Sequence, residues 1–178
     1  MATASELQQQ GEKLFHQHDY EAAAQVFQQA LEAYEADGLH DKATEMRVNI
    51  ALIHRSLGEY DQALDLMQQA LKFFQEQGDA KRAAMVLGNL GGLYAAMGDK
   101  EQAYNAYRQA ADTFEELGEE KLYGETLVAM GDLQVREGKL TSGAATYQVG
   151  LEHLGDLNMR QKIIRRLSGL INRFGGGS

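Results

Sequence analysis

The chain has 178 residues, 44% of them hydrophobic, a length and composition typical of one folded domain rather than of a disordered chain. It contains no cysteine, which excludes disulfides, thiolate zinc ligands and cysteine nucleophiles, and no proline, which suits a chain of long helices. Its formal net charge is -9, and because an acidic protein repels phosphate backbones, we expect no nucleic acid among its partners.

The chain also lacks the sequence features of a membrane or secreted protein. No apolar run approaches the roughly 18 residues that a membrane span needs. The first residues, MATASELQQQ, lack the basic and then apolar order of a signal peptide. We therefore expect a cytoplasmic protein.

Four similar segments follow one another along the chain. They are HDYEAAAQVFQQAL from residue 18, GEYDQALDLMQQAL from residue 58, GDKEQAYNAYRQAA from residue 98 and GKLTSGAATYQVGL from residue 138, a constant spacing of 40 residues. Small residues recur in each copy where two helices must approach closely, and large apolar residues recur on one helical face. The small positions are Ala23, Ala63, Ala103 and Gly143, and Ala30, Ala70, Ala110 and Gly150. The large ones are Phe27, Met67, Tyr107 and Tyr147, and Tyr34, Phe74, Phe114 and Leu154.

Helix breaks recur with the same period. The turn inside each copy is marked by His18, Gly58, Gly98 and Gly138, and the turn between copies by Gly38, Gly78 and Gly118. Glycine ends helices well because it adopts the left-handed conformation without steric cost. The pattern predicts eight helices, over about residues 4–17, 20–37, 41–57, 60–77, 80–97, 100–117, 120–137 and 140–154.

The tail differs from the repeats in charge. No acidic residue follows Asp156, and five basic residues do. We interpret residues 157–173 as a helix that caps the fourth copy, because LSGLI at 167–171 lies 40 residues after LVAMG at 127–131. The alternative is an amphipathic helix on a membrane surface, with arginines on one side and apolar residues on the other. The apolar residues are Ile163, Ile164, Leu167, Ile171 and Phe174. Residues 175–178, GGGS, are typical of a linker or a remnant of cloning.

The segment NLGGLYAAMGDKEQAYNAYRQAA resembles a tetratricopeptide repeat, whose pattern is a Leu-Gly pair, an aromatic residue, a Gly-Asp turn, an alanine, an aromatic residue and an alanine. The 40-residue period is similar to that of the longer-helix variety, found in spindle-orientation adaptors with Leu-Gly-Asn repeats and in bacterial regulators. The resemblance implies an all-α fold in a single domain, residues 1–174. This domain would be a right-handed α-solenoid of four helix pairs, at about 4–37, 41–77, 80–117 and 120–154, plus the C-terminal capping helix.

We find no arrangement of residues that predicts catalysis. The glycine-rich segment VLGNLGG at 86–92 lacks the preceding strand, and the Lys followed by Ser or Thr, of a phosphate-binding loop. Isolated serines and threonines have no His-Asp pair in matching register, and the carboxylates are spread along helix surfaces. We therefore expect no enzyme activity, no catalytic residues, no cofactor and no metal site.

The resemblance places a binding groove along the first helix of each pair. Its slots fall on three residues of the first copy, Gln8, Gln9 and Glu12, and on eleven residues of the later copies. These are Glu45, Val48, Asn49, Leu52, Met85, Gly88, Asn89, Gly92, Glu125, Val128 and Asp132. Asn49 and Asn89 lie 40 residues apart, so their amides could hold the backbone of an extended peptide or, equally, tie neighbouring helices together. Gly88 and Gly92, four residues apart, predict a bare patch on the groove floor.

These features predict a non-catalytic interaction module, a scaffold or adaptor, that binds a protein or peptide segment in its groove. Glu45, Glu125 and Asp132 favour a partner with basic residues. We expect a monomer. Two alternatives remain open: an assembly protein that forms a homo-oligomer through its ends, and peripheral membrane recruitment through the basic C-terminal helix.

Overall fold

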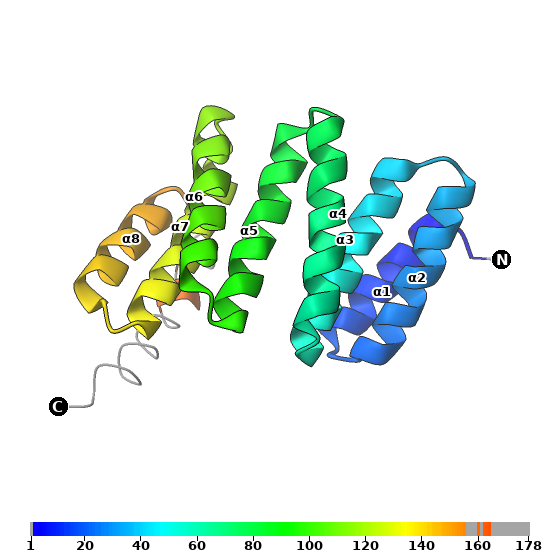
Figure 1. Ribbon diagram of the computed structural model, residues 1–178, viewed down its shortest axis with the longest axis horizontal. Helices are drawn as coiled ribbons and strands as arrows, with labels where there is room; N and C mark the ends of the chain where they lie inside the picture. Colours follow the sequence, from blue (N-terminus) through cyan, green and yellow to red (C-terminus); the bar gives the residue numbers. More distant parts are fainter. Residues whose placement is uncertain (1, 156–159, 161, 165–178) are drawn as a thin grey trace.

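The described part of the chain up to residue 155 folds as a row of eight α-helices, each packed against the next along the chain (Figure 1). The computed structural model describes residues 2–155, 160 and 162–164, and these residues include no β-strand. The helices are α1 (Ala4–His16), α2 (Tyr20–Ala36), α3 (His40–Leu57), α4 (Tyr60–Glu76), α5 (Ala80–Met97), α6 (Lys100–Glu116), α7 (Glu120–Arg136) and α8 (Leu140–Glu152). Each begins and ends within two residues of its predicted bounds, so the all-α class and the succession of helix pairs are confirmed.

The turns have the left-handed backbone that the repeat predicts. Gly38, Gly58, Gly78, Gly98, Gly118 and Gly138 all have φ angles between 68° and 83°. His18 stands at the same position of the first copy and has a φ of 62°, although it is not glycine. A residue with a side chain is strained at such a positive φ. The ring Nδ1 of His18 lies 2.9 Å from the Tyr20 hydroxyl. The position in the repeat therefore determines the backbone conformation even where the residue is unfavourable.

Side chains satisfy the free N–H groups at several helix starts. Thr3 and Glu6 form a capping box on α1: the Thr3 hydroxyl accepts from the Glu6 N–H at 3.2 Å, and the Glu6 carboxylate accepts from the Thr3 N–H at 2.7 Å. Asp19, Asp79 and Asp99 accept from the N–H three residues on, at the starts of α2, α5 and α6. Each cap fixes the residue at which the next helix begins.

The two helices of a pair meet at a large side chain lying on a small residue. A Cβ at Gly91 would lie 2.6 Å from the Tyr107 ring, and a Cβ at Gly131 would lie 2.6 Å from the Tyr147 ring. These distances are shorter than any real contact, so each ring packs directly on the backbone of the first helix. The second copy has Ala51 at this position and the flexible Met67 in place of the ring. All the large repeat residues named above are buried, as predicted.

The fourth pair, α7 and α8, packs through glycines on both helices. A Cβ at Gly124 would lie 2.6 Å from the carbonyl oxygen of Gly150, and a Cβ at Gly150 would lie 2.8 Å from that of Gly124. Gly131 and Gly143 form a second reciprocal pair, with 3.2 Å in both directions. The backbones of α7 and α8 therefore touch at two places, where any larger residue would push them apart.

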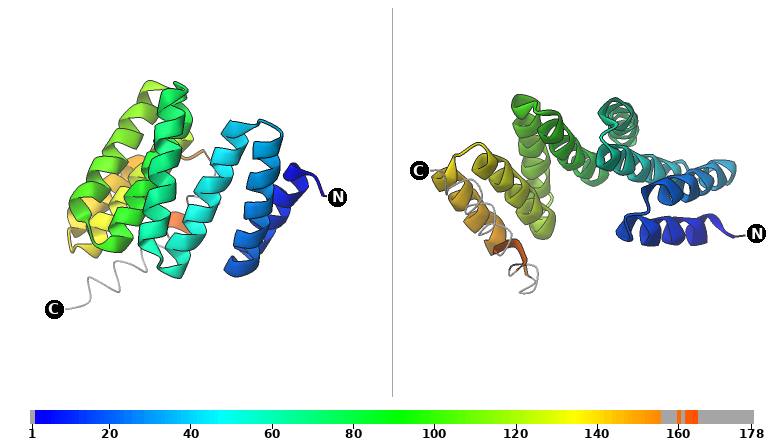
Figure 2. Two further views of the ribbon diagram at one scale, coloured as in Figure 1. Left: turned by 45° about the vertical axis from the view of Figure 1, so that its right-hand side comes forward. Right: turned by 90° about the horizontal axis from the view of Figure 1, so that it is seen from below.

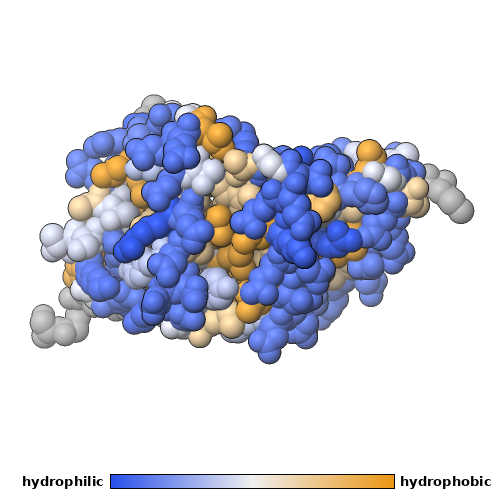
Figure 3. Space-filling model, turned by 45° about the horizontal axis from the view of Figure 1, so that its top comes forward, coloured by the Kyte–Doolittle hydropathy of each residue, from blue (hydrophilic) through white to orange (hydrophobic). Residues whose placement is uncertain are grey.

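The eight helices follow an arc when the molecule is seen from below (Figure 2, right). The first helices of neighbouring pairs approach each other, because α3 contacts α5 and α5 contacts α7. Among the described residues, the second helices α2, α4, α6 and α8 make no comparable contacts with one another. The first helices therefore line the inner side of the curve. On the face seen in Figure 3, hydrophobic residues gather in a furrow between hydrophilic ridges.

The predicted capping helix, residues 157–173, lies mostly outside the described residues, as do Leu167, Ile171 and Phe174. Residues 160 and 162–164 are described and are helical. Ile163 packs on the buried cluster of Val128, Val135, Tyr147 and Leu154. Arg160 also donates to the carbonyl oxygens of Glu152 and Leu154, so these residues cover the end of the fourth pair, as a cap would.

Candidate binding groove

Three successive hollows along the inner side of the curve share lining residues. The first, the N-terminal hollow, has a volume of about 440 Å³ and lies between α1, α3 and α5. It is lined by eight residues at predicted groove slots: Gln8, Glu12, Glu45, Val48, Asn49, Leu52, Met85 and Asn89. Gln8 is held in place, because its amide accepts from the Tyr34 hydroxyl at 2.9 Å and donates to Glu12 at 2.9 Å.

Asn49 and Asn89 both lie on the wall of the N-terminal hollow, and both are half-buried. Within the described part of the chain, neither side-chain amide forms a hydrogen bond to a neighbouring helix. The alternative reading, in which these asparagines tie helices together, therefore finds no support in the geometry. An amide that is half-buried and unbonded can donate to a carbonyl and accept from an N–H of another chain.

The acidic wall of this hollow is already engaged by cations. The Glu45 carboxylate lies 2.8 Å from Lys42 Nζ and 3.1 Å from Arg82 Nη1. Arg82 also bonds Asp79 at 2.6 Å and Asp41 at 3.1 Å, and it lies over the Phe74 ring, 4.9 Å from its centroid. Hydrogen bonds from Arg82 hold the pKa values of Asp41 and Asp79 below their usual range. Arg82 thus links α3 to α5 and neutralises part of the groove charge.

The middle hollow, of about 260 Å³, lies between α5 and α7 and shares Met85 and Asn89 with the N-terminal hollow. A Cβ added at Gly88 would meet nothing within 4 Å, so the groove floor is open there as predicted. Met85 beside it is 44% exposed, which is high for a large apolar side chain. The middle hollow therefore combines bare backbone with an exposed apolar side chain.

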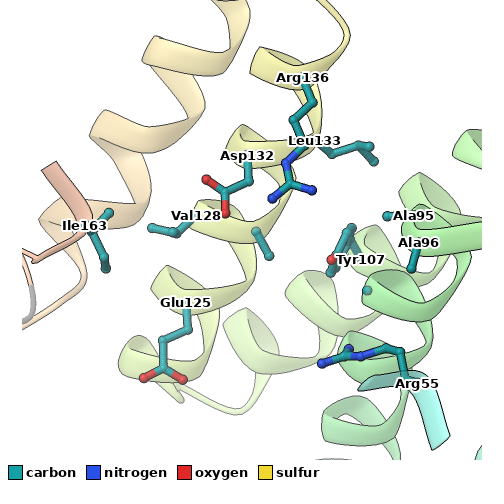
Figure 4. Close-up of a pocket in the computed structure, with 12 residues that line it drawn as sticks. Arg55, Ala95, Ala96, Tyr107, Glu125, Val128, Asp132, Leu133, Arg136 and Ile163 are labelled. Carbon is teal, nitrogen blue, oxygen red and sulfur yellow. The ribbon is translucent and has the colours of Figure 1, made fainter. Parts of the chain in front are cut away.

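The C-terminal hollow is the largest of the three, at about 510 Å³, and lies between α3, α5 and α7 (Figure 4). It contains the remaining predicted slots, Gly92, Glu125, Val128 and Asp132. Gly92 is not bare, which corrects the predicted patch: a Cβ there would lie 2.7 Å from Arg55 Nη1. The guanidinium of Arg55, from the preceding repeat, extends over Gly92 and fills the space that the glycine leaves.

Two slots of the C-terminal hollow are more enclosed than a groove surface would be. Val128 and Asp132 are each only 6% exposed. Val128 packs toward α8, because a Cβ at Gly150 would lie 3.1 Å from its Cγ2. The close glycine contacts between α7 and α8 draw this valine into the core, so it offers little apolar surface to a partner.

Of the fourteen predicted groove slots, all but Gln9 line one of the three hollows, so the structure brings these thirteen residues to one side of the solenoid. Whether they bind a partner stays a prediction. Sequence reasoning missed Arg55 and Arg136, which also line the C-terminal hollow. A signal was present for Arg55, because the equivalent residues 40 and 80 positions later are Ala95 and Val135.

A second charged cluster lies at the turn between α7 and α8. Glu137, with a side chain 7% exposed, pairs with Lys139 at 2.7 Å and with Lys100 at 3.6 Å. The Tyr104 hydroxyl donates to it at 3.2 Å. The bond from Lys139 lowers the pKa of Glu137, while burial and the nearby Glu137 charge raise the pKa of Tyr104 to about 12. These contacts join α6 to the turn and do not line the groove.

Two further kinds of site are absent from the described residues. No group of three or more His, Asp or Glu side chains in this part of the chain could hold a metal ion. No helix in the same part is long and apolar enough to cross a membrane.

Residues 41–116, from the start of α3 to the end of α6, match the family model of the tetratricopeptide repeat. These central copies are tetratricopeptide repeats. The 40-residue register extends the same repeat to α1 and α2 and to α7 and α8. None of the curated protein sequences matches the chain significantly.

Solved structures with similar folds include two tetratricopeptide-like helical proteins. A Rap protein in complex with Competence and Sporulation Factor is 19% identical, with a TM-score of 0.78 over 94% of this chain and 53% of the other. BtubC (BKLC) from P. vanneervenii is 20% identical, with a TM-score of 0.66 over 93% of this chain and 65% of the other. The chain thus spans between about half and two thirds of these proteins, and the likeness at such low identity shows the α-solenoid fold alone.

Proposed function

We propose that the chain is a non-catalytic interaction module that binds an extended segment of a partner protein along the inner side of the solenoid. The observation that carries this proposal is the continuous groove: three hollows sharing lining residues, with half-buried asparagine amides on its wall. Tetratricopeptide repeats present extended concave surfaces of this kind to other chains. The Rap protein of similar fold was solved in a complex, which also supports a binding role.

Asn49 and Asn89 would bond the backbone of the segment, and Val48, Leu52 and Met85 would contact its apolar side chains. Backbone recognition by amides does not depend on the partner's sequence, so apolar and charged neighbours must supply specificity. The prediction of basic residues in the partner is untested. Glu45 contributes little to it, because Lys42 and Arg82 already engage that carboxylate.

The test uses the Asn49→Ala/Asn89→Ala double variant and short peptides selected from a random-sequence library by the wild-type protein. Two lost hydrogen bonds of about 0.5–1.5 kcal/mol each predict peptide binding weaker by roughly tenfold. Fluorescence anisotropy of the labelled peptides measures the affinity. Asn105→Ala is the matched control, because Asn105 is exposed on the second helix α6 and lines none of the three hollows.

Circular dichroism would show that the double variant keeps its helical content. Gly88→Leu is a second variant, which fills the open floor of the middle hollow and should also weaken binding. Peptides that bind all these variants as tightly as the wild type would disprove groove binding, as would failure to select any peptide.

A further inference from the structure

Two arginines in the C-terminal hollow carry hydrogen-bond donors that the described chain does not use. Arg55, near the end of α3, and Arg136, at the end of α7, enter the hollow from opposite sides (Figure 4). Over the described residues, neither guanidinium forms a hydrogen bond or an ion pair. Arg47 and Arg82, by contrast, are each bonded to carboxylates. The described residues therefore pair Arg47 and Arg82 with carboxylates but give Arg55 and Arg136 no such partner.

The end of the Arg55 side chain lies over the bare backbone of Gly92. Its Nη1 would lie 2.7 Å from a Cβ at that position, so a side chain there would displace it. The equivalents of Gly92 in the neighbouring copies are Leu52 and Asp132. The glycine thus departs from the repeat at the place where the arginine of the preceding repeat lies.

The surroundings of the two guanidinium groups favour a single negative charge. Ala95, Ala129 and Leu133 supply apolar walls, and a charge pair is stronger next to such walls than in open water. Of the two carboxylates in the hollow, Asp132 is buried and lies on α7 one turn from Arg136, away from Arg55 (Figure 4). Glu125 lies 3.8 Å from Lys121 at the rim. The Asp132 and Glu125 side chains would repel a bound phosphate, which carries nearly two negative charges, more strongly than a bound carboxylate, which carries one.

We propose that the C-terminal hollow binds a carboxylate of the partner segment between Arg55 and Arg136. This inference rests on the proposed function, and it makes the occupant of this part of the groove an acidic segment of a protein. A guanidinium presents two parallel N–H donors that match the two oxygens of a carboxylate. An Asp or Glu side chain and a C-terminal carboxylate offer the same group to this site.

The test uses the selected peptides that contain an acidic residue, each synthesised with Glu, Gln or phosphoserine at that position. A second set carries either a free or an amidated C-terminus. We expect the wild type to bind the carboxylate form roughly tenfold more tightly than the neutral form. Arg55→Gln and Arg136→Gln should each reduce this preference, and Arg55→Lys should restore it only in part because lysine lacks the paired donors. Arg108→Gln, an exposed residue of α6, should leave the preference unchanged.

The outcomes separate this inference from the proposed function. If peptides bind in a manner sensitive to Asn49 and Asn89 but the carboxylate and neutral forms bind equally, the carboxylate site is wrong and the groove remains. Tighter binding of the phosphoserine form would also overturn it, in favour of a phosphate site. Failure of every peptide to bind would overturn both. If binding depends on Glu rather than Gln, the site holds a side-chain carboxylate. If it depends on a free rather than an amidated C-terminus, the site holds the terminal carboxylate.

Discussion

At the scale of single residues, Arg82 shows how one side chain can stabilise the junction between two repeats. It joins Asp79, which caps its own helix, to Asp41 and Glu45 on α3, and its guanidinium covers the Phe74 ring. Three carboxylates lie around one cation, and Glu45 has Lys42 as a second partner. A single exposed ion pair contributes little, but a network around a side chain only 31% exposed contributes more.

We predict that Arg82→Gln lowers the free energy of unfolding by about 1–2 kcal/mol at pH 7. The pKa values of Asp41 and Asp79 are lowered in the folded state, so their contribution is present above the unfolded value of about 3.9 and is lost as pH falls through the folded values. The difference between variant and wild type should therefore shrink below about pH 4. Urea unfolding at several pH values measures it.

The control for this prediction is again Arg108→Gln, which removes an exposed arginine of α6 that lines no hollow. It should change stability by less than about 0.5 kcal/mol at any of these pH values. A loss in Arg82→Gln that stayed constant through the acidic range would show that packing on Phe74, rather than the carboxylates, accounts for the effect.

At the scale of helices, the glycines of α7 and α8 set how closely the fourth pair packs. The reciprocal approach of Gly124 and Gly150 leaves no room for a methyl group on either helix. Gly88 on α5 is the opposite case, a helical glycine whose Cβ would meet open space. The same substitution at these positions should therefore have opposite effects.

We predict that Gly124→Ala destabilises the protein by about 1–3 kcal/mol, because the backbone of Gly150 must move away. Gly88→Ala should stabilise it by up to about 1 kcal/mol, since alanine is the better helix former and nothing obstructs it. Thermal and urea unfolding of both variants measure the difference. Equal effects of the two substitutions would contradict the close contact between α7 and α8.

At the scale of the whole molecule, the surface of the first helix bears on whether copies associate end to end. The outward side of α1 is polar, with Ser5, Gln9, Gln10 and Lys13 all exposed. A terminal repeat with a polar outer face ends a solenoid instead of extending it. This surface favours a monomer over an assembly built through the N-terminal end.

We predict that light scattering gives the mass of a single chain, unchanged by protein concentration. Association through α1 would bury its polar side chains without compensating bonds, which costs free energy. Raising the salt concentration serves as a control for weak charge-driven contacts, which it would remove. A mass that rises with concentration at high salt would favour the self-associating alternative.

The sequence by itself determined the repeat, the eight helices and the six glycine turns, because these depend on local preference and on a period of 40 residues. It also determined which residues face the core. Small residues at Ala23 and Ala63 and large ones at Phe27 and Met67 lie on one helical stripe wherever the helix is placed. The 40-residue spacing alone also predicted that Asn49 and Asn89 lie on the same side of the solenoid, where both line the N-terminal hollow.

Only the tertiary structure decided what lies next to each groove residue. The extension of Arg55 over Gly92, the burial of Val128 against α8 and the engagement of Glu45 by Arg82 all join side chains from different helices. Their positions depend on how closely neighbouring helices approach, as α7 and α8 do at Gly124 and Gly150. A repeat pattern does not determine those distances, because it predicts which face of a helix a residue occupies but not how far away the neighbouring helix lies.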